Sequence, residues 1–245
     1  MEYMVEAALV CDKGRLRQNN EDNFYFGGTV LGDGNDGLEE ALSLSVNADE
    51  KPVFAVFDGV GGEALGEQAS AIAADELGKC VFDSADNDNI LRFAAHRMNE
   101  RVLKAAEDNG VALMATTMAA LRFAPGRVTV CNVGDSRVYK LDGKKLVRLS
   151  LDHTAPIAEG ELKPRLSQYI GQKKALVPFV SVQSPENGDV YLVCSDGVTD
   201  MISEEKIAKI LSSGPVRAVQ KLRGRALENG GRDNITAIVC RITEI

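Results

Sequence analysis

The sequence of 245 residues predicts an α+β fold. Short runs rich in valine, leucine and aromatic residues indicate strands, and two pairs of longer segments repeat apolar residues at helical spacing. Along the chain these segments come in the order strands, helix pair, strands, helix pair, strand. This grouped order is typical of α+β proteins, in which helices cover an antiparallel sheet.

The predicted strands are short apolar runs bounded by turn-forming residues. Between Arg127 and Leu149 they follow one another closely, with turns at Pro125-Gly126 and Asp142-Gly143, which predicts an antiparallel meander. The full set of predicted strands is 7–11, 23–26, 52–57, 118–123, 127–133, 137–141, 146–149, 190–194 and 235–242.

Two helix pairs interrupt the strands. The first comprises 66–79 and 89–109, which are rich in alanine, and the second of these has an apolar stripe at helical spacing. In the second pair, Ser203 precedes Glu204 and Glu205 as a capping residue would, and Pro215 opens a helix that ends before two glycines.

The chain is predicted to form one domain, 1–245, because it contains no repeat and no long polar linker. Segments 32–51 and 153–188 lack clear periodicity. Long irregular segments in compact domains are usually functional or mobile.

Composition excludes several classes of function. The formal net charge is −8 and the pI is near 5.0, so nucleic acid and anionic membranes are poor partners. No apolar run approaches the length of a membrane span, and Glu2 and Glu6 stand where a signal peptide carries positive charge. We therefore expect a cytoplasmic protein. The 5 cysteines are scattered without a C-x-x-C pair, which predicts reduced core residues.

Acidic residues lie where predicted strands begin or end. Turn formation and helix capping would explain any one of them, although turns accept asparagine or serine equally well. Several carboxylates converging at one sheet edge would repel one another unless cations neutralise them, and oxygen ligands favour Mg²⁺ or Mn²⁺ over zinc. Pattern alone thus goes no further than a candidate oxygen-ligand metal site. These acids are Glu21, Asp22, Asp58, Asp135, Asp196 and Asp233.

A competing motif starts at Gly59. The stretch 59–64 has the spacing G-x-G-x-x-A between a predicted strand and a predicted helix, as a dinucleotide-binding turn would. Asp58 would put a negative charge beside the pyrophosphate, and two helices follow instead of a second strand. We disfavour this alternative, and no Gly-Lys-Ser/Thr sequence follows that would make a P-loop.

Taken in order, a series of short motifs resembles the metal-dependent serine/threonine protein phosphatase family, type 2C, in its compact bacterial form. The motifs span 17 to 240, nearly the whole chain. They are Arg17-Gln-Asn-Asn-Glu-Asp22, Phe57-Asp-Gly-Val-Gly-Gly62, Gly66-Glu-Gln-Ala-Ser70, Ala115-Thr-Thr117, Asn132-Val-Gly-Asp-Ser-Arg137, Asp152-His-Thr154, Leu166-Ser-Gln168, Cys194-Ser-Asp-Gly-Val-Thr-Asp200 and Gly231-Arg-Asp-Asn-Ile-Thr236.

The resemblance implies a four-layer α/β/β/α sandwich, with two central antiparallel sheets flanked by helix pairs. It also implies two Mn²⁺ or Mg²⁺ ions, with Asp58 bridging them and the Gly59 carbonyl on one of them. The other expected ligands of the pair are Glu21, Asp196 and Asp233.

Further roles follow from the same resemblance. Asp22 would hold a metal-bound water, and Asp135 together with Asp196 would bind a weaker third ion. Arg17 corresponds to the phosphate clamp. Two cations can activate a water and neutralise phosphoryl charge, so no protein nucleophile is required.

The sequence departs from the family pattern in three places. Val60 stands where eukaryotic members carry a histidine proposed as general acid, so the proton donor is unidentified. The flap segment after His153 is shortened, and 32–51 is a longer, acidic loop that we expect to be solvated. His96 is expected on the surface and His153 in a structural hydrogen bond.

The sequence therefore predicts a Mn²⁺- or Mg²⁺-dependent phosphatase that hydrolyses phosphoserine and phosphothreonine by a metal-activated water. Expected partners are phosphorylated proteins, substrates of a Ser/Thr kinase, and the expected state is a monomer. One alternative is a non-catalytic module of the same fold that binds phosphoproteins, which would have lost a metal ligand. Another is a metal-dependent hydrolase of a different phosphoester.

Overall fold

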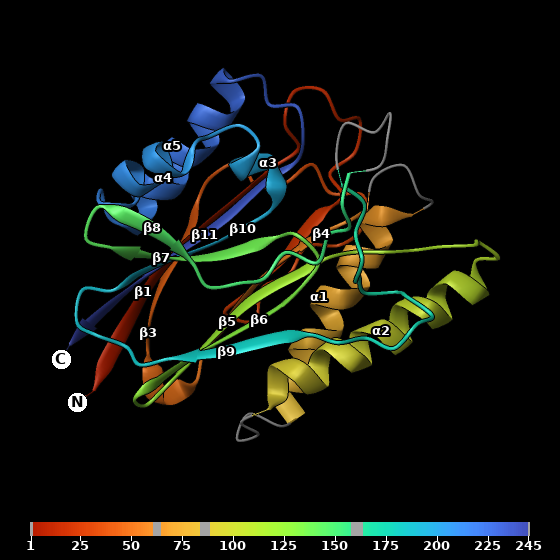
Figure 1. Ribbon diagram of the computed structural model, residues 1–245, viewed down its shortest axis with the longest axis horizontal. Coiled ribbons are helices and arrows are strands. Elements are labelled where there is room, and N and C mark those ends of the chain that lie inside the picture. The colour runs from red at the N-terminus through yellow and green to blue at the C-terminus, as the bar shows by residue number, and fades with distance from the viewer. Residues whose placement is uncertain (1, 61–64, 84–88, 158–163, 245) are drawn as a thin grey trace.

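The computed structural model describes residues 2–60, 65–83, 89–157 and 164–244. Two antiparallel sheets lie face to face, one helix pair covers the outer face of each sheet, and the two termini lie close together (Figure 1). The α+β prediction and the four-layer sandwich that the resemblance implied are both confirmed.

The first sheet has 6 strands in the order β3-β1-β11-β10-β7-β8. Within it β1 and β11 pair over their whole lengths, from Tyr3 opposite Glu244 to Asp12 opposite Ile235. The strands of this sheet are β1 Tyr3–Asp12, β3 Leu42–Asn47, β7 Arg137–Asp142, β8 Lys145–Arg148, β10 Val190–Cys194 and β11 Ile235–Glu244.

The second sheet has 5 strands in the order β2-β4-β5-β6-β9. Asp22 at the start of β2 pairs with Asp58 at the end of β4, which brings two of the predicted site residues side by side. The strands of this sheet are β2 Asp22–Phe26, β4 Val53–Asp58, β5 Met118–Ala124, β6 Arg127–Val133 and β9 Phe179–Gln183.

The helix pairs predicted from periodicity are present. α1 Gly66–Asp83 and α2 Ile90–Asp108 pack on the second sheet, and α4 Glu204–Leu211 and α5 Pro215–Glu228 on the first (Figure 1). A short α3 and a 3₁₀ turn, η1, were not predicted. Their bounds are α3 Asp196–Thr199 and η1 Ala48–Glu50.

The core lies in three layers. The layer between the sheets contains a chain of aromatic contacts, with ring centroids 5.4 Å apart for Phe26 and Phe54, 5.9 Å for Phe54 and Phe123, and 5.8 Å for Phe123 and Tyr191. Each outer layer joins one sheet to its helices. All 5 cysteines are buried and free, which confirms their assignment as reduced core residues.

The meander predicted between Arg127 and Leu149 is wrong in its middle. The hairpins β5–β6 and β7–β8 form, but β6 belongs to the second sheet and β7 to the first. Gly134 has a φ of 97°, and there the chain passes between the sheets instead of turning back. Strand patterns show where strands lie but not which sheet each joins, and this crossing puts Asp135 between the two sheets.

Two strands lie in segments predicted to be irregular. β3 and η1 occupy part of 32–51, and β9 lies within 153–188. The acids of the first segment are exposed as expected, although Asp36 pairs with Lys13 at 2.6 Å. Of the predicted shortened flap, 158–163 lies outside the described residues.

The dinucleotide-binding alternative does not fit the sheet. β4 has antiparallel neighbours on both sides, whereas that motif needs parallel strands. Residues 61–64 of the motif lie outside the described part of the chain. Among the helices described, none combines the length and apolar character that crossing a membrane requires.

Candidate active site

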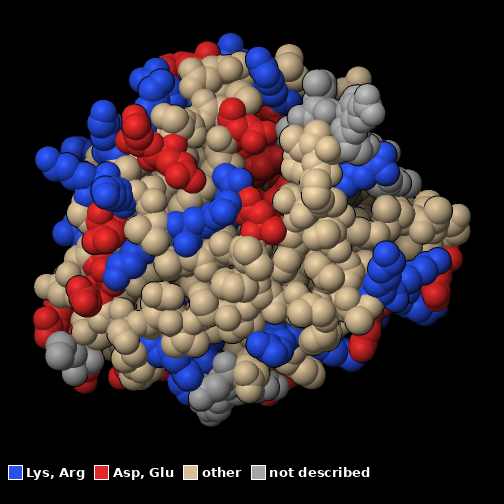
Figure 2. Space-filling model, viewed as in Figure 1, with Lys and Arg blue, Asp and Glu red and all other residues tan. Residues whose placement is uncertain are grey.

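One pocket of about 580 Å³ collects most of the predicted site residues. It lies at one end of both sheets, where β4, β6 and β10 end and β11 begins. Figure 2 shows acidic side chains in a hollow on this face, with uncharged surface beside it. The predicted site residues that line the pocket are Arg17, Asp58, Gly59, Asp135, Asp196 and Asp233.

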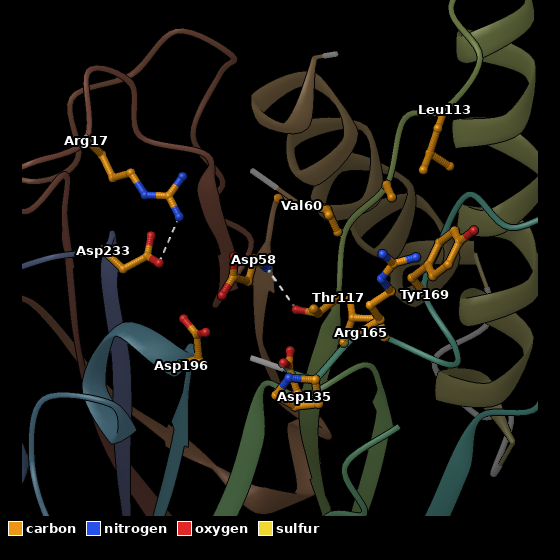
Figure 3. Close-up of a pocket in the computed structure, with 14 residues that line it drawn as sticks. Arg17, Asp58, Val60, Leu113, Thr117, Asp135, Arg165, Tyr169, Asp196 and Asp233 are labelled. Carbon is orange, nitrogen blue, oxygen red and sulfur yellow. Dashed lines mark hydrogen bonds and ion pairs between the residues drawn. The ribbon is translucent and has the colours of Figure 1, made fainter. Parts of the chain in front are cut away.

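Asp58 ends β4 on the pocket floor, held by its backbone. Its N–H donates to Thr117 Oγ1 at 3.0 Å, and its carbonyl accepts from the Thr117 N–H at 2.8 Å and from Thr116 Oγ1 at 3.0 Å (Figure 3). Burial, followed by the negative charges of Asp22 and Asp196, raises the pKa of Asp58 well above its usual value. Its side chain is thus left for a ligand while the main chain is fixed.

Gly59 is needed because two backbone segments meet there. A Cβ at this position would lie 2.5 Å from the Gly66 carbonyl oxygen and 2.6 Å from that of Glu21. The Gly59 N–H donates to the Glu21 carbonyl at 3.0 Å, so the close approach joins the start of β2 to the end of β4.

Asp22 lies behind the pocket and is only 1% exposed. Its Oδ2 accepts from the hydroxyls of Ser195 at 2.8 Å and Thr236 at 2.7 Å, whereas its Oδ1 is buried with no hydrogen-bond partner. Burial and the nearby charges of Asp196 and Asp233 raise the pKa of Asp22 to about 7. An unpaired buried carboxylate oxygen is costly, and it marks a place where a cation or a bound water fits.

Two arginines, Arg17 and Arg165, line this pocket, and Arg17 lies on the side of Asp233 (Figure 3). Its Nη2 donates to Asp233 Oδ2 at 2.9 Å, and its Nη1 lies 3.6 Å from Glu21 Oε2. Asp233 Oδ1 accepts from the Asn234 N–H, and Asn234 Oδ1 in turn accepts from the Glu21 N–H, both at 2.9 Å. Burial raises the pKa of Glu21 although Arg17 opposes the rise.

Asp135 and Asp196 are shared by two cavities. Both line the main pocket, and both line an adjoining cavity of about 170 Å³ together with Asp200. Asp135 comes from the crossing between β6 and β7, and Asp196 begins α3 directly after β10. The structure therefore brings together the two residues that were predicted to bind a third ion.

These residues fit divalent metal ions by their chemistry. The donors are carboxylates and a backbone carbonyl, which hard cations such as Mg²⁺ and Mn²⁺ prefer, and a buried Asp22 oxygen has no protein partner. Among the described residues, however, no three Asp, Glu, His or Cys side chains already lie close enough to enclose an ion. The acids converge on one pocket, and Arg17 now pairs with two of them.

The match to a family model decides what this site is. Residues 38–225 match the model described as Protein phosphatase 2C. The chain belongs to the protein phosphatase 2C family. PstP of Mycobacterium tuberculosis, a serine/threonine protein phosphatase, is 29% identical over 249 residues, which cover 95% of this chain and 44% of PstP. This chain therefore spans less than half the length of that relative.

Two further comparisons agree over nearly the whole of both chains. The protein phosphatase PhpP of Streptococcus pneumoniae is 29% identical over 262 residues, 98% of each chain. Among solved structures, the PstP catalytic domain in complex with 2 manganese ions has a TM-score of 0.78 at 26% identity, covering 99% of this chain and 100% of that one. This chain thus shares the fold of a manganese-binding relative.

Some residues of the site were not assigned a role from the sequence. Thr117 anchors Asp58, Ser195 and Thr236 hold Asp22, and Asn234 links Glu21 to Asp233. All four stand inside the motifs that carried the resemblance, and Ser195 and Asn234 are each next to an acid in the sequence. These positions were the available signal. On the other side of the pocket, Ala115 and Leu166 also stand inside those motifs, whereas Tyr169 lies just after Leu166-Ser-Gln168 in a segment without periodicity.

The two histidines of the chain lie where the sequence predicted. His153 Nδ1 accepts from the Gly134 N–H at 3.2 Å, and the backbones of the two residues bond again at 2.9 Å, which confirms a structural hydrogen bond. Burial lowers the pKa of His153, so the ring stays a neutral acceptor. His96 is exposed on α2.

Proposed function

We propose that this chain is a Mn²⁺- or Mg²⁺-dependent phosphatase that hydrolyses phosphoserine and phosphothreonine in proteins. The observation that supports this most is the convergence of the acids on one pocket around Asp58, with a buried Asp22 oxygen that has no protein partner. The loss of a ligand that a non-catalytic module would show is not seen. A single domain, a monomeric state, a cytoplasmic location and a Ser/Thr kinase as counterpart stay predictions.

The metal ligands in this proposal are those predicted from the resemblance. Bound ions would supply an activated water and neutralise the charge of the phosphoryl group. Asp58 would bridge the pair and Asp22 would hold a water, while Asp135 and Asp196 would bind the weaker third ion. The remaining ligands would be Glu21, the Gly59 carbonyl, Asp196 and Asp233.

Arg17 would bind the substrate phosphate. Its guanidinium already lies at the pocket rim, 38% exposed at the side chain, and a planar fork can bond two phosphate oxygens at once. The same group now pairs with Asp233, so phosphate would compete with that carboxylate for it.

Val60, which cannot donate a proton, occupies the position after Asp58 and Gly59 where eukaryotic members of the family carry a histidine. We infer that water protonates the leaving oxygen of serine or threonine. His153→Ala and Tyr169→Phe should then slow a phosphothreonine peptide no more than p-nitrophenyl phosphate, whose leaving group needs no proton. A loss confined to the peptide with either variant would identify that residue as the acid.

Phosphate release tests the proposed function directly. The substrates are phosphothreonine, phosphoserine and phosphotyrosine peptides of one sequence, each assayed with Mn²⁺, with Mg²⁺ and with EDTA. We expect release from the first two with metal and none in EDTA. Full activity in EDTA would refute metal dependence, and binding without release would favour the non-catalytic module.

A further inference from the structure

The main pocket has a second wall that the proposed chemistry does not use. Figure 3 shows Leu113 and Tyr169 on the side away from Arg17 and Asp233, with Val60 between the two sides. These three side chains are partly buried, so part of each apolar surface faces the pocket. Arg165, which is exposed, lies beside Tyr169 on the same side (Figure 3). We call the apolar part of this surface the apolar wall, formed by Val60, Leu113, Ala115, Leu166 and Tyr169.

The Val60 N–H donates to the Ala115 carbonyl at 3.0 Å, and the rest of the apolar wall comes from two segments joined by backbone hydrogen bonds. The Thr116 N–H donates to the Ile170 carbonyl at 3.1 Å, and the Ile170 N–H donates back to Thr116 at 2.9 Å. Gly171 follows with a φ of 101°, and a Cβ there would overlap the Met114 carbonyl oxygen. Only glycine lets the two segments lie this close, so the pairing is built into the sequence.

Helix α2 fixes the same segment from behind. Asn99 Oδ1 accepts from the N–H groups of Gly171 at 2.8 Å and Gln172 at 2.9 Å, and its Nδ2 donates to the Gln172 carbonyl at 3.1 Å. The buried side chain of Gln172 accepts from the Tyr169 N–H at 3.1 Å. The backbone that carries Tyr169 is therefore held in place before any ligand arrives, and a preorganised backbone reduces the entropic loss on binding.

The position of this wall indicates what it contacts. It shares one cavity with the acids and Arg17, so a phosphorylated side chain at the acidic end places its neighbours in the peptide beside the wall. A cavity of about 580 Å³ has room for more than a phosphate. We propose that the apolar wall binds an apolar side chain directly adjacent to the phosphoserine or phosphothreonine of the substrate. This inference rests on the proposed function and adds a substrate class to it.

Matched peptides test the inference. A phosphothreonine peptide carries leucine, serine or aspartate at the position before the phosphorylated residue, and a second series varies the position after it. With Mn²⁺ present, we expect leucine at one of these positions to raise kcat/KM about tenfold over serine, mainly through a lower KM. The ratio is measured within one enzyme preparation, so differences in active fraction cancel.

Variants of the apolar wall test whether this wall causes the preference for leucine over serine. Leu113→Ser and, independently, Tyr169→Ser should bring the leucine-to-serine ratio close to 1, whereas Tyr169→Phe should keep it because the ring remains. Val182→Ser is the matched control, since Val182 is apolar and 55% exposed on β9, outside the pocket. It should leave both activity and ratio unchanged. Far-ultraviolet circular dichroism confirms that each variant is folded.

The outcomes separate this inference from the proposed function. Release from both peptides with a wild-type ratio near 1, or a preference for aspartate, would overturn the inference and leave the phosphatase proposal intact. An unchanged ratio in folded Leu113→Ser and Tyr169→Ser would also overturn it. No release from any peptide with Mn²⁺ would overturn the proposed function, and the inference with it.

Discussion

The main chain of Asp58 holds the residue in the fold, and its side chain remains available to bind a cation. The main chain is fixed by three hydrogen bonds to Thr116 and Thr117, and the carboxylate lies among other acids that raise its pKa. Asp22 faces it across paired strands, with two hydroxyls on one oxygen and none on the other. Such carboxylates destabilise the fold on their own, which is typical of residues kept for binding a cation.

Asp58→Asn should abolish activity and preserve the fold. The amide keeps the shape and the backbone hydrogen bonds but loses the charge that would hold two cations, so we expect kcat to fall by several orders of magnitude. In EDTA the variant should unfold at the same temperature as wild type or higher, because one repulsive charge is gone. Steady-state kinetics measures kcat, and thermal unfolding measures the unfolding temperature. A variant that unfolds at lower temperature would indicate a purely structural aspartate.

Arg17→Ala should act on substrate binding more than on turnover. A charge-assisted bidentate contact is worth about 1.5–3 kcal/mol, so KM for a phosphopeptide should rise roughly 10- to 100-fold while kcat changes less. Manganese affinity, measured by calorimetry, should change little. An unchanged KM would show that this arginine only pairs with Asp233 and Glu21 and does not bind the substrate.

At the scale of elements, the antiparallel order of the strands gathers the site. β4, β6 and β10 end at the edge where β2 and β11 begin, because antiparallel neighbours run in opposite directions. Acids far apart in the sequence thereby meet at one end of the sandwich. The crossing from β6 to β7 adds Asp135 from between the two sheets.

The substitution Asp135→Ala tests the role of Asp135 as a ligand of the third ion. Because Asp135 and Asp196 are shared with the adjoining cavity, removal of Asp135 should weaken only the third ion. We expect a smaller loss of turnover than with Asp58→Asn and two manganese ions still bound per chain. Calorimetric titration with Mn²⁺ gives the number of manganese ions bound per chain. Loss of all bound manganese would place Asp135 in the main pair instead.

Local pattern predicted most elements but not their partners. β6 was predicted with its observed bounds, and the helices within a few residues, because apolar periodicity is a property of each segment. β3 and β9 were not predicted because they are edge strands with partly exposed residues, set within polar segments. The change of sheet after Val133 is a tertiary event, decided by what packs on each face.

The site was predictable where acids mark strand ends and unpredictable where backbone geometry builds it. The acids that line the pocket were all named from the sequence, with the resemblance supplying their roles. The apolar wall depends on Gly171 and on Asn99, which lies 72 positions away along the chain in α2. A contact at that separation leaves no periodic trace in the sequence.

At the scale of the whole molecule, the packed layers hold together acids that repel one another. Three apolar layers and the full-length pairing of β1 with β11 fix the ends of the strands that carry them. Burial and the neighbouring acids raise the pKa of Asp22 to about 7 from an ordinary value of 3.8. Between these values the folded chain binds the proton more tightly than the unfolded chain, so the contribution of Asp22 to stability falls as pH rises from about 4 to 7.

Asp22→Asn should remove that pH dependence. In EDTA we expect the Tm of the variant, relative to wild type, to rise by several degrees between pH 5 and pH 7.5, because only the wild type must ionise a buried carboxyl. Asp33→Asn, at an exposed acid, should shift Tm equally at both pH values. With Mn²⁺ at pH 7.5 the wild type should gain more than the variant, since the cation pairs with the carboxylate and binds only the folded state. A Tm difference that is constant with pH would show that Asp22 is already ionised at pH 5, and that the hydroxyls of Ser195 and Thr236 outweigh its burial.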